Sequence, residues 1–250
     1  MDPGLINTWL IAAVLLAISL GALFKGMTGI GLPIFAVPAI AMITSVEEAV
    51  ILMIIPGLAA NMWLVARHRR FFSLLREHYR FLLAGFIGGI LGTVFLARVD
   101  DRWLKLLLAG WLALYLIQYV LGDLFRQLFR SRGKAAIVFG LTAGTLQGAT
   151  GMSAHVVAPY FHDRNISPEG YALLVTSAFL IFSVAQFSTS VATGLFTPER
   201  LLVSAIALLP TLFFTRVGIS MGGMISATTF NRILLATFVA MEVKLLADVL

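Results

Sequence analysis

The chain has 250 residues, 60% of them hydrophobic and only 12% charged, with a mean hydropathy of +0.96. This composition excludes a soluble protein and predicts a polytopic membrane protein. The net charge of +6 comes largely from two basic loops, residues 67–80 and 126–134, which is typical of cytoplasmic loops rather than of a nucleic-acid-binding surface. The absence of cysteine excludes disulfides, thiolate metal sites and thiol catalysis.

Hydrophobic stretches recur along the whole chain, and several approach the roughly 20 residues that span a bilayer. The first stretch lacks a basic leader and a small-residue cleavage site, so we expect it to be retained. The loops are short, which predicts an all-α polytopic membrane protein with a single transmembrane domain over residues 1–250. The stretches cover approximately residues 5–24, 33–44, 46–66, 81–97, 103–121, 135–147, 169–192, 199–215 and 228–250.

The first unusual segment is Lys25-Gly-Met-Thr-Gly-Ile-Gly31, a polar, glycine-rich interruption between two apolar stretches. Lipid cannot form hydrogen bonds with the backbone N–H and C=O groups that an interrupted helix exposes. Such a segment is therefore packed in protein or lines a water-filled cavity. A helix that begins there, with Pro33 in its first turn, points N–H groups and its positive dipole end at the cavity, which favours an anion. The binding candidates are Lys25, Thr28, Gly29 and Gly31. Tight helix crossing at the glycines, and a Lys25 that extends to the interface, are the alternatives.

Two further features follow in the first half. The segment Ser45-Val-Glu-Glu48 has a capping-box pattern, so we expect a helix to begin there, with Asn61 buried within it as a candidate binding amide. The next stretch carries small residues at four-residue spacing, which predicts close helix packing, with a sliding surface as the functional alternative. These small residues are Ala84, Gly88 and Gly92, with Gly85 and Gly89 one position on.

A second glycine-rich stretch, Gln147-Gly-Ala-Thr-Gly-Met-Ser153, lies about 122 residues after the first. Ser153 is placed to cap a helix that begins near Ala154, and an anion is again the favoured ligand. The binding candidates here are Gln147, Thr150, Gly151, Ser153 and His155, with Gln186 in the next long segment as the counterpart of Asn61. The amides have cross-helix hydrogen bonding, and His155 simple packing, as alternative roles.

The recurrence predicts an internal duplication, with repeat 1 over about residues 5–122 and repeat 2 over about 133–250. The ends of the halves also align, residues 101–109 with 228–236. If each glycine stretch is the tip of a re-entrant hairpin, the repeats are inverted, and if each is a kink within one crossing, they are parallel. We favour the hairpin form, because residues 33–44 are short for a full span.

Carboxylates are nearly absent from the apolar stretches, and Glu242 in the last one is the exception. Its burial in a membrane segment would suit a proton-coupling acid, and His155 is the second candidate for proton coupling. Lys244 lies two residues from Glu242 and therefore on another face of the helix. An interfacial position for Glu242 is the alternative.

The motifs Gly26-Met-Thr-Gly-Ile-Gly31 with Pro38, and Gly148-Ala-Thr-Gly-Met-Ser153 with Pro159, resemble the twin glycine motifs of the TauE/SafE family of sulfite and organosulfonate exporters. The resemblance covers nearly the whole chain. It implies transport of sulfite or of organosulfonates such as sulfoacetate- or taurine-type compounds across the bacterial cytoplasmic (inner) membrane, usually outward. The second half departs from the pattern at residues 153–155, where the family often has glycines, so the resemblance supports a small anion better than sulfite itself.

We therefore expect a secondary transporter that works by alternating access, with a small anionic substrate held at the glycine stretches and the lipid bilayer around it. No nucleic-acid partner, metal or cofactor is expected, and a homodimer stays open. An anion channel, or a carrier of another organic anion, is the alternative. An enzyme using Ser153 or Ser183 with His155 is disfavoured, because Ser153 and His155, two residues apart on a helix, point about 200° apart and no acid orients the histidine.

Overall fold

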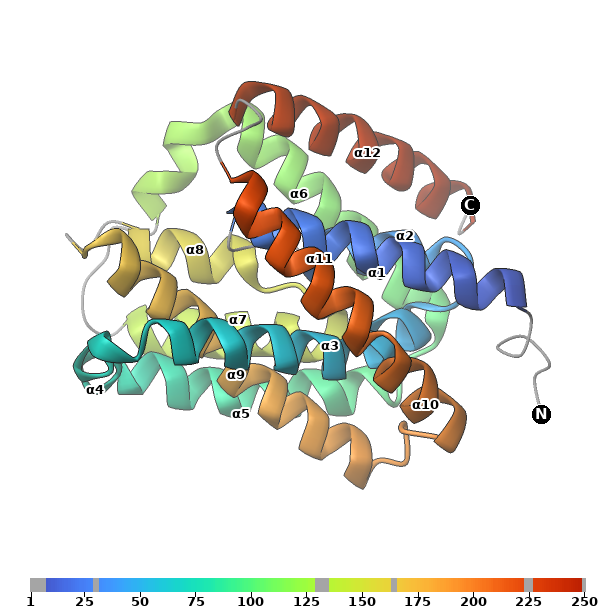
Figure 1. The fold of residues 1–250 in the computed structure, drawn as a ribbon, viewed down its shortest axis with the longest axis horizontal. Coiled ribbons are helices and arrows are strands. Elements are labelled where there is room, and N and C mark those ends of the chain that lie inside the picture. The colour runs from blue at the N-terminus through green and yellow to red at the C-terminus, as the bar shows by residue number, and fades with distance from the viewer. Residues whose placement is uncertain (1–7, 29–31, 129–134, 163–165, 223–226, 249–250) are drawn as a thin grey trace. The chain divides into compact units, whose positions relative to one another are not determined.

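The computed structural model describes residues 8–28, 32–128, 135–162, 166–222 and 227–248, and every regular element in these ranges is a helix (Figure 1). The prediction of an all-α protein is confirmed for this part of the chain. By Cα proximity the chain forms two compact units. Unit 1 comprises Met1–Pro56, Val99–Val120 and Phe196–Leu250, and unit 2 comprises Gly57–Arg98 and Leu121–Leu195. Each unit therefore combines segments that are far apart in the sequence.

Five helical stretches among the described residues are long and apolar enough to cross a membrane, which agrees with a multi-pass protein. The predicted stretch 199–215 is divided into two consecutive helices around Ala207. The five stretches are Thr8–Met27, Val46–Arg67, Tyr79–Leu96, Pro168–Ala192 and Pro198–Met221.

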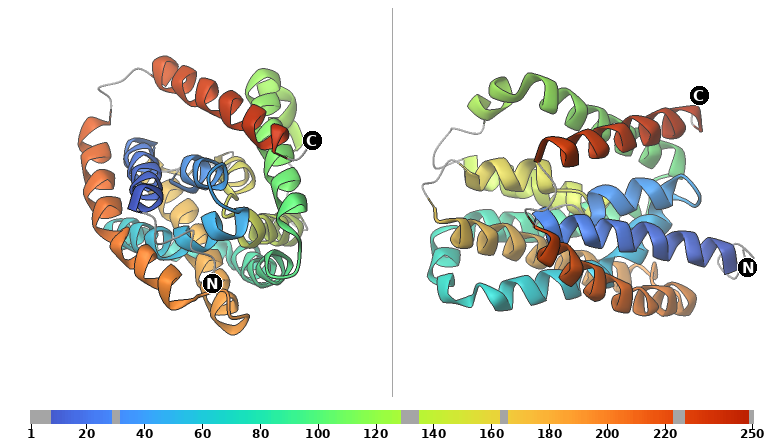
Figure 2. Two further views of the ribbon diagram at one scale, coloured as in Figure 1. Left: turned by 90° about the vertical axis from the view of Figure 1, so that its right-hand side faces the viewer. Right: turned by 45° about the horizontal axis from the view of Figure 1, so that its top comes forward.

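In unit 1, α2 folds back along α1. The helices of this unit are α1 (Thr8–Thr28), α2 (Leu32–Ala41), the first part of α3 (Val46–Arg67), most of α6 (Asp101–Leu128), α10 (Pro198–Ile206), α11 (Leu208–Met221) and α12 (Ala227–Ala247). A Cβ added at Gly21, two turns before the end of α1, would lie 2.6 Å from the carbonyl oxygen of Leu32, and the rings of Phe24 and Phe35 are 5.0 Å apart. A continuing helix could not return to these positions, so α1 and α2 form a hairpin (Figure 2).

The start of α3 in unit 1 agrees with the capping prediction. The hydroxyl of Ser45 accepts a hydrogen bond of 3.1 Å from the backbone N–H of Glu48, and α3 begins one residue after Ser45. The two carboxylates of the first turn pair with Arg200 on α10, at 2.8 Å for Glu47 and 2.7 Å for Glu48. The acids thus join α3 to α10 across a separation of more than 150 residues.

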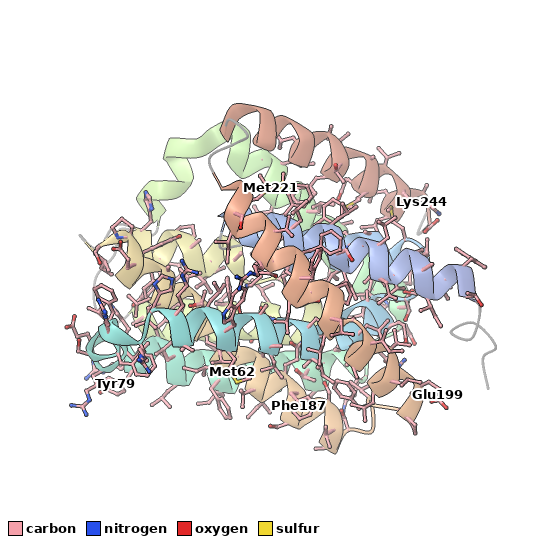
Figure 3. All side chains as sticks on the ribbon, in the orientation of Figure 1. Met62, Tyr79, Phe187, Glu199, Met221 and Lys244 are labelled. Carbon is pink, nitrogen blue, oxygen red and sulfur yellow. The ribbon has the colours of Figure 1, made fainter. Side chains whose placement is uncertain are left out.

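Unit 2 is built on a close approach of α5 and α7. Its elements are the end of α3, η1 (Arg69–Phe71), α4 (Ser73–Glu77), α5 (Tyr79–Leu96), the end of α6, α7 (Ala135–Thr150), α8 (Ala154–His162) and α9 (Pro168–Ala192). Side chains on the outside of these helices, such as Met62 on α3 and Tyr79 at the start of α5, project away from them (Figure 3).

The small-residue face predicted for residues 84–92 is a packing face. A Cβ on Gly88 or Gly92 would overlap the backbone of α7, and a Cβ on Gly144 or Gly148 would overlap the backbone of α5. Gly85 and Gly89, also on α5, face Phe182 and Ala185 of α9. The glycines of α5 therefore allow both α7 and α9 to approach it closely.

The helices α5, α7 and α9 run in the same direction. Along α5 and α7 the facing pairs rise together in sequence, from Phe81 with Gly140 to Gly89 with Gly148. The facing positions of α9 rise with them, from Phe182 opposite Gly85 to Ala185 opposite Gly89. This common direction fixes which residues of α9 lie level with the end of α7.

The short helix α8 folds back along α7, as α2 does along α1. The ring of Tyr160 on α8 lies 6.0 Å from that of Phe139, three turns before the end of α7, and stacks at 4.2 Å on Phe81. The second glycine stretch therefore joins two helices that pack against each other, and whether the repeats are inverted or parallel stays a prediction.

Candidate functional site

The second glycine stretch is a sharp turn between α7 and α8. The helix α7 ends at Thr150, and Gly151 adopts φ = 71°, a left-handed conformation that glycine tolerates and a side chain would strain. The backbone N–H of Gly151 donates to the carbonyl of Gln147 at 2.8 Å, and that of Met152 donates to the hydroxyl of Thr150 at 3.2 Å. The turn is thus closed by its own backbone and by one threonine.

Three of the predicted residues meet at this turn. The hydroxyl of Ser153 donates to Oε1 of Gln147 at 2.8 Å, and Nε2 of Gln186 donates to the carbonyl oxygens of Gln147 at 2.9 Å and of Gly148 at 3.3 Å. All of these side chains are buried, with exposed fractions of 6% for Gln147 and 1% for Ser153 and Gln186. The alternative role of a cross-helix amide therefore holds for Gln186, which ties α9 to the end of α7.

The hydroxyls of Thr150 and Ser153 already donate within the protein. Thr150 is fully buried and its Oγ1 donates to the carbonyl of Leu146 at 2.8 Å. Ser153 stands directly before α8, and its carbonyl accepts from Val156 and Val157, both at 3.0 Å. Its hydroxyl, which we expected to cap α8, instead donates to Gln147. Both hydroxyls therefore brace the turn and retain only acceptor capacity.

Two more predicted residues lie in unit 2. His155 is in the first turn of α8, and both of its ring nitrogens are shielded from the surface. Asn61 is buried on α3, with an exposed fraction of 4%. A buried amide and a buried imidazole are costly in a membrane protein unless they hydrogen-bond or bind a ligand, so both stay candidates.

The first glycine stretch belongs to unit 1. Lys25 is in the last turn of α1 and is buried, with an exposed fraction of 3%. Thr28 ends α1, Pro33 is in the first turn of α2 as expected, and Gly29 and Gly31 lie outside the described residues. A Cβ on Gly26 would overlap the backbone of α11, so this glycine serves helix crossing.

Glu242 lies on α12 in unit 1. Its Oε2 is shielded and has no hydrogen-bond partner among the residues that the structure describes. Lys244 pairs with Asp248 rather than with Glu242, in agreement with their different faces on the helix. Nothing in the described part of unit 1 neutralises this carboxylate by an ion pair.

The sequence analysis considered Ser183 of α9 only as an enzyme candidate and did not include Ser190 of α9 at all. Ser183 and Ser190 are buried and lie three residues before and four residues after Gln186, so all three share one face of the helix. This three-and-four spacing around a buried amide was the available signal. Serine is frequent in membrane helices, where it often bonds to its own backbone, so this spacing alone does not mark a site.

A comparison with models of protein families agrees with the multi-pass helical architecture of the chain. The family model described as "Sulfite exporter TauE/SafE" matches residues 13–245, a range that includes both glycine stretches and all of the spanning helices listed above except the first residues of α1. No curated protein and no solved structure matches the chain. The matched range is nearly the whole chain, so the general properties of the family apply to it. The protein is a multi-pass membrane transporter, not an enzyme, and its substrate is a small anion. The chain belongs to the TauE/SafE sulfite exporter family.

Proposed function

We propose that this transporter exports sulfite or a small organosulfonate, of the sulfoacetate or taurine type, across the bacterial cytoplasmic membrane. Membership of a sulfite exporter family supports the class of substrate. The sequence around both glycine stretches supports the sign of its charge, because residues 17–44 and 139–161 contain a lysine and a histidine but no carboxylate. An anion that approaches either segment is therefore not repelled by a negatively charged side chain of that segment.

The observation that carries the proposal is the buried polar turn between α7 and α8. Thr150, Ser153 and Gln186 are at most 1% exposed, and they surround the point where α8 begins. The first N–H groups of a helix have no carbonyl one turn earlier, and the helix dipole adds positive potential there. We propose that a sulfonate or sulfite oxygen binds these N–H groups, with Gly151 and His155 beside it and Asn61 as a further amide.

Lys25 is the proposed counterpart in the first half, with Thr28, Gly29 and Gly31. It is the charged residue at the place where the second half has Gln147. A buried ammonium attracts anions strongly in a medium of low dielectric constant. We propose that the halves are an internal duplication and that each glycine stretch provides anion contacts in an alternating-access cycle. Proton coupling, if the transporter uses it, is assigned to His155 or Glu242.

Thermal unfolding of the detergent-purified protein with added anions tests the proposal. The panel contains sulfite, sulfate, thiosulfate, taurine and sulfoacetate, with acetate and chloride as controls. A saturable rise in melting temperature with one sulfur anion supports the proposal, because a ligand that binds the folded state stabilises it. The same measurement on Lys25→Ala should lose the shift, whereas Lys105→Ala, a partly exposed lysine of unit 1 paired with Asp101, should keep it.

Flux into proteoliposomes separates a carrier from a channel. A carrier gives saturable uptake of the stabilising anion and exchange of labelled for unlabelled anion across the membrane. Uptake that rises linearly with concentration, without exchange, would favour the channel alternative. No thermal shift with any sulfur anion would count against the sulfonate assignment and would direct the search to carboxylates and phosphates.

A further inference from the structure

We propose that the segment between α3 and α5 binds the phosphate groups of anionic phospholipids at the membrane surface. The binding face, which we call the basic surface, consists of the exposed arginines Arg67, Arg69, Arg70, Arg76 and Arg80. The proposal goes beyond the transport function and does not depend on which anion is carried. It draws on three observations within unit 2: the location of the segment, its fixed conformation and its excess of positive charge.

The segment links two candidate membrane spans. The helix α3 ends at Arg67 and α5 begins at Tyr79, and both are long and apolar enough to cross a bilayer. The link forms η1 and α4 at one end of these helices (Figure 1). A short link between two spans lies at the level of the lipid headgroups. Phe72 and Tyr79 are 47% and 50% exposed there, which suits aromatic side chains at a membrane interface.

The segment is held in place by contacts with α8 and α9. A Cβ added at Gly170, near the start of α9, would lie 2.9 Å from Cδ1 of Leu74 on α4. The buried ring of His78 lies edge-on to that of Phe161 on α8, with 5.2 Å between the ring centroids. The arginines are therefore presented on folded backbone, so that less conformational entropy is lost when a ligand binds.

Positive charge on the basic surface exceeds the negative charge around it. Residues 67–80 contain five arginines and one carboxylate, that of Glu77, and Glu169 at the start of α9 acts on the same segment through His68. No salt bridge joins any of the five arginines to a carboxylate among the described residues, whereas Arg200 in unit 1 pairs with two. A guanidinium binds a phosphate through two parallel hydrogen bonds. Clusters of about four to eight basic residues beside a membrane span are typical of sites for anionic lipids.

The other end of α5 has no such excess. The link from α5 to α6 carries two bases and two acids, Arg98 and Arg102 with Asp100 and Asp101. Both of its arginines are exposed. The excess charge is therefore confined to one end of α5, and the balanced link provides a control of the same chemical type.

The test compares the double variant Arg69→Gln/Arg70→Gln with Arg98→Gln/Arg102→Gln. Phosphatidylglycerol, which is anionic, and phosphatidylcholine with the same acyl chains, which has no net charge, are added to the detergent-purified protein. Inorganic phosphate is added in a third series. We measure the lipid concentration that gives half of the maximal rise in melting temperature, and the number of lipid molecules retained in native mass spectrometry.

We expect phosphatidylglycerol to stabilise the wild-type protein at lower concentration than phosphatidylcholine, because a ligand that binds the folded state stabilises it. Arg69→Gln/Arg70→Gln should raise the half-maximal concentration of phosphatidylglycerol roughly tenfold and reduce the number of retained molecules. Arg98→Gln/Arg102→Gln should change it less than about twofold. High salt should weaken the response of the wild-type protein to phosphatidylglycerol but not to phosphatidylcholine. If the first variant gives too little folded protein, Arg70→Gln/Arg76→Gln takes its place.

Four outcomes would overturn the proposal. Equal responses of the wild-type protein to both lipids would show that it has no preference for anionic headgroups. An unchanged response of Arg69→Gln/Arg70→Gln, or equal losses in the two double variants, would remove the basic surface as the location. Stabilisation by inorganic phosphate at the same concentration as by phosphatidylglycerol would mean that the ligand is a soluble anion and not a lipid.

Discussion

The two glycine stretches form helix crossings of the same kind, but the side chains next to the glycines differ. In unit 1 a Cβ on Gly26 of α1 would overlap α11 at Thr215 and Gly218, and in unit 2 a Cβ on Gly148 of α7 would overlap α5 at Gly89 and at its next turn. The contacted positions of α11 lie 126 residues after those of α5. The same backbone contact is thus made twice, once in each unit.

The difference lies in the residue before each glycine. Lys25 precedes Gly26, whereas Gln147 precedes Gly148 and bonds with Ser153. The crossing in unit 2 also extends over more turns, since Gly140 and Gly144 continue it along α7. The glycines therefore provide close packing in both places, while the neighbouring side chains carry the chemistry: a charge in one unit and an amide network in the other.

The largest effect is expected when a crossing is blocked. Gly26→Val and Gly148→Val should each abolish folding or destabilise the protein by more than about 3 kcal/mol, because the new side chain meets backbone that cannot move aside. The fraction of monodisperse protein and the melting temperature in detergent measure the effect. Gly110→Val in unit 1 and Gly57→Val in unit 2 are the controls, since an added Cβ there meets nothing within 4 Å. A well-folded Gly26→Val protein would show that the two crossings are not equivalent.

The next effect concerns the charge. Lys25→Gln gives the first stretch the amide of the second, and it should weaken sulfur-anion binding roughly 10- to 100-fold, as expected when a charged hydrogen-bond donor is lost. The protein should remain folded, because the amide retains donors. Titration of the thermal shift provides the affinity, and Lys105→Gln is the control. An unchanged affinity would remove Lys25 from the site.

A smaller effect is expected from the amide network. Gln186→Met approximately preserves the side-chain volume and removes the hydrogen-bond donors to Gln147 and Gly148. The free energy of unfolding without anion should therefore fall by about 1–3 kcal/mol. Thermal unfolding without ligand measures this loss. Val184→Met, at an exposed position of the same helix, should leave the melting temperature nearly unchanged. An equally stable Gln186→Met protein would mean that the network does not support the turn.

The smallest effect, and the opposite sign, is expected where a helical glycine has open space. Gly57→Ala and Gly110→Ala should raise the free energy of unfolding by up to about 1 kcal/mol, because alanine favours the helix and nothing lies within 4 Å of the new Cβ. Denaturation curves of the variants measure the gain. A loss of stability at either position would show that the added methyl group meets a neighbour that the structure does not place within 4 Å of it.

Local patterns predicted much of this molecule. The start of α3 after Ser45, the packing face around Gly88 and the interruption at Gly151 each depend on neighbouring residues in the sequence, and the structure has all three. What the sequence did not reveal is which distant helix each pattern meets. The packing of α1 on α11, and the partner of the Ser153 hydroxyl, depend on the three-dimensional arrangement, to which helix periodicity and capping rules do not extend.

The pairing of Glu47 and Glu48 with Arg200 sets an order of events during biosynthesis. The acids are translated about 150 residues before their arginine, which at roughly 5–20 residues per second is about 8–30 s earlier. The glycine surface of α1 waits still longer for α11. A nascent chain released after its first half would leave both unpartnered. Both contacts of unit 1 therefore form only after the chain has been synthesised as far as α11.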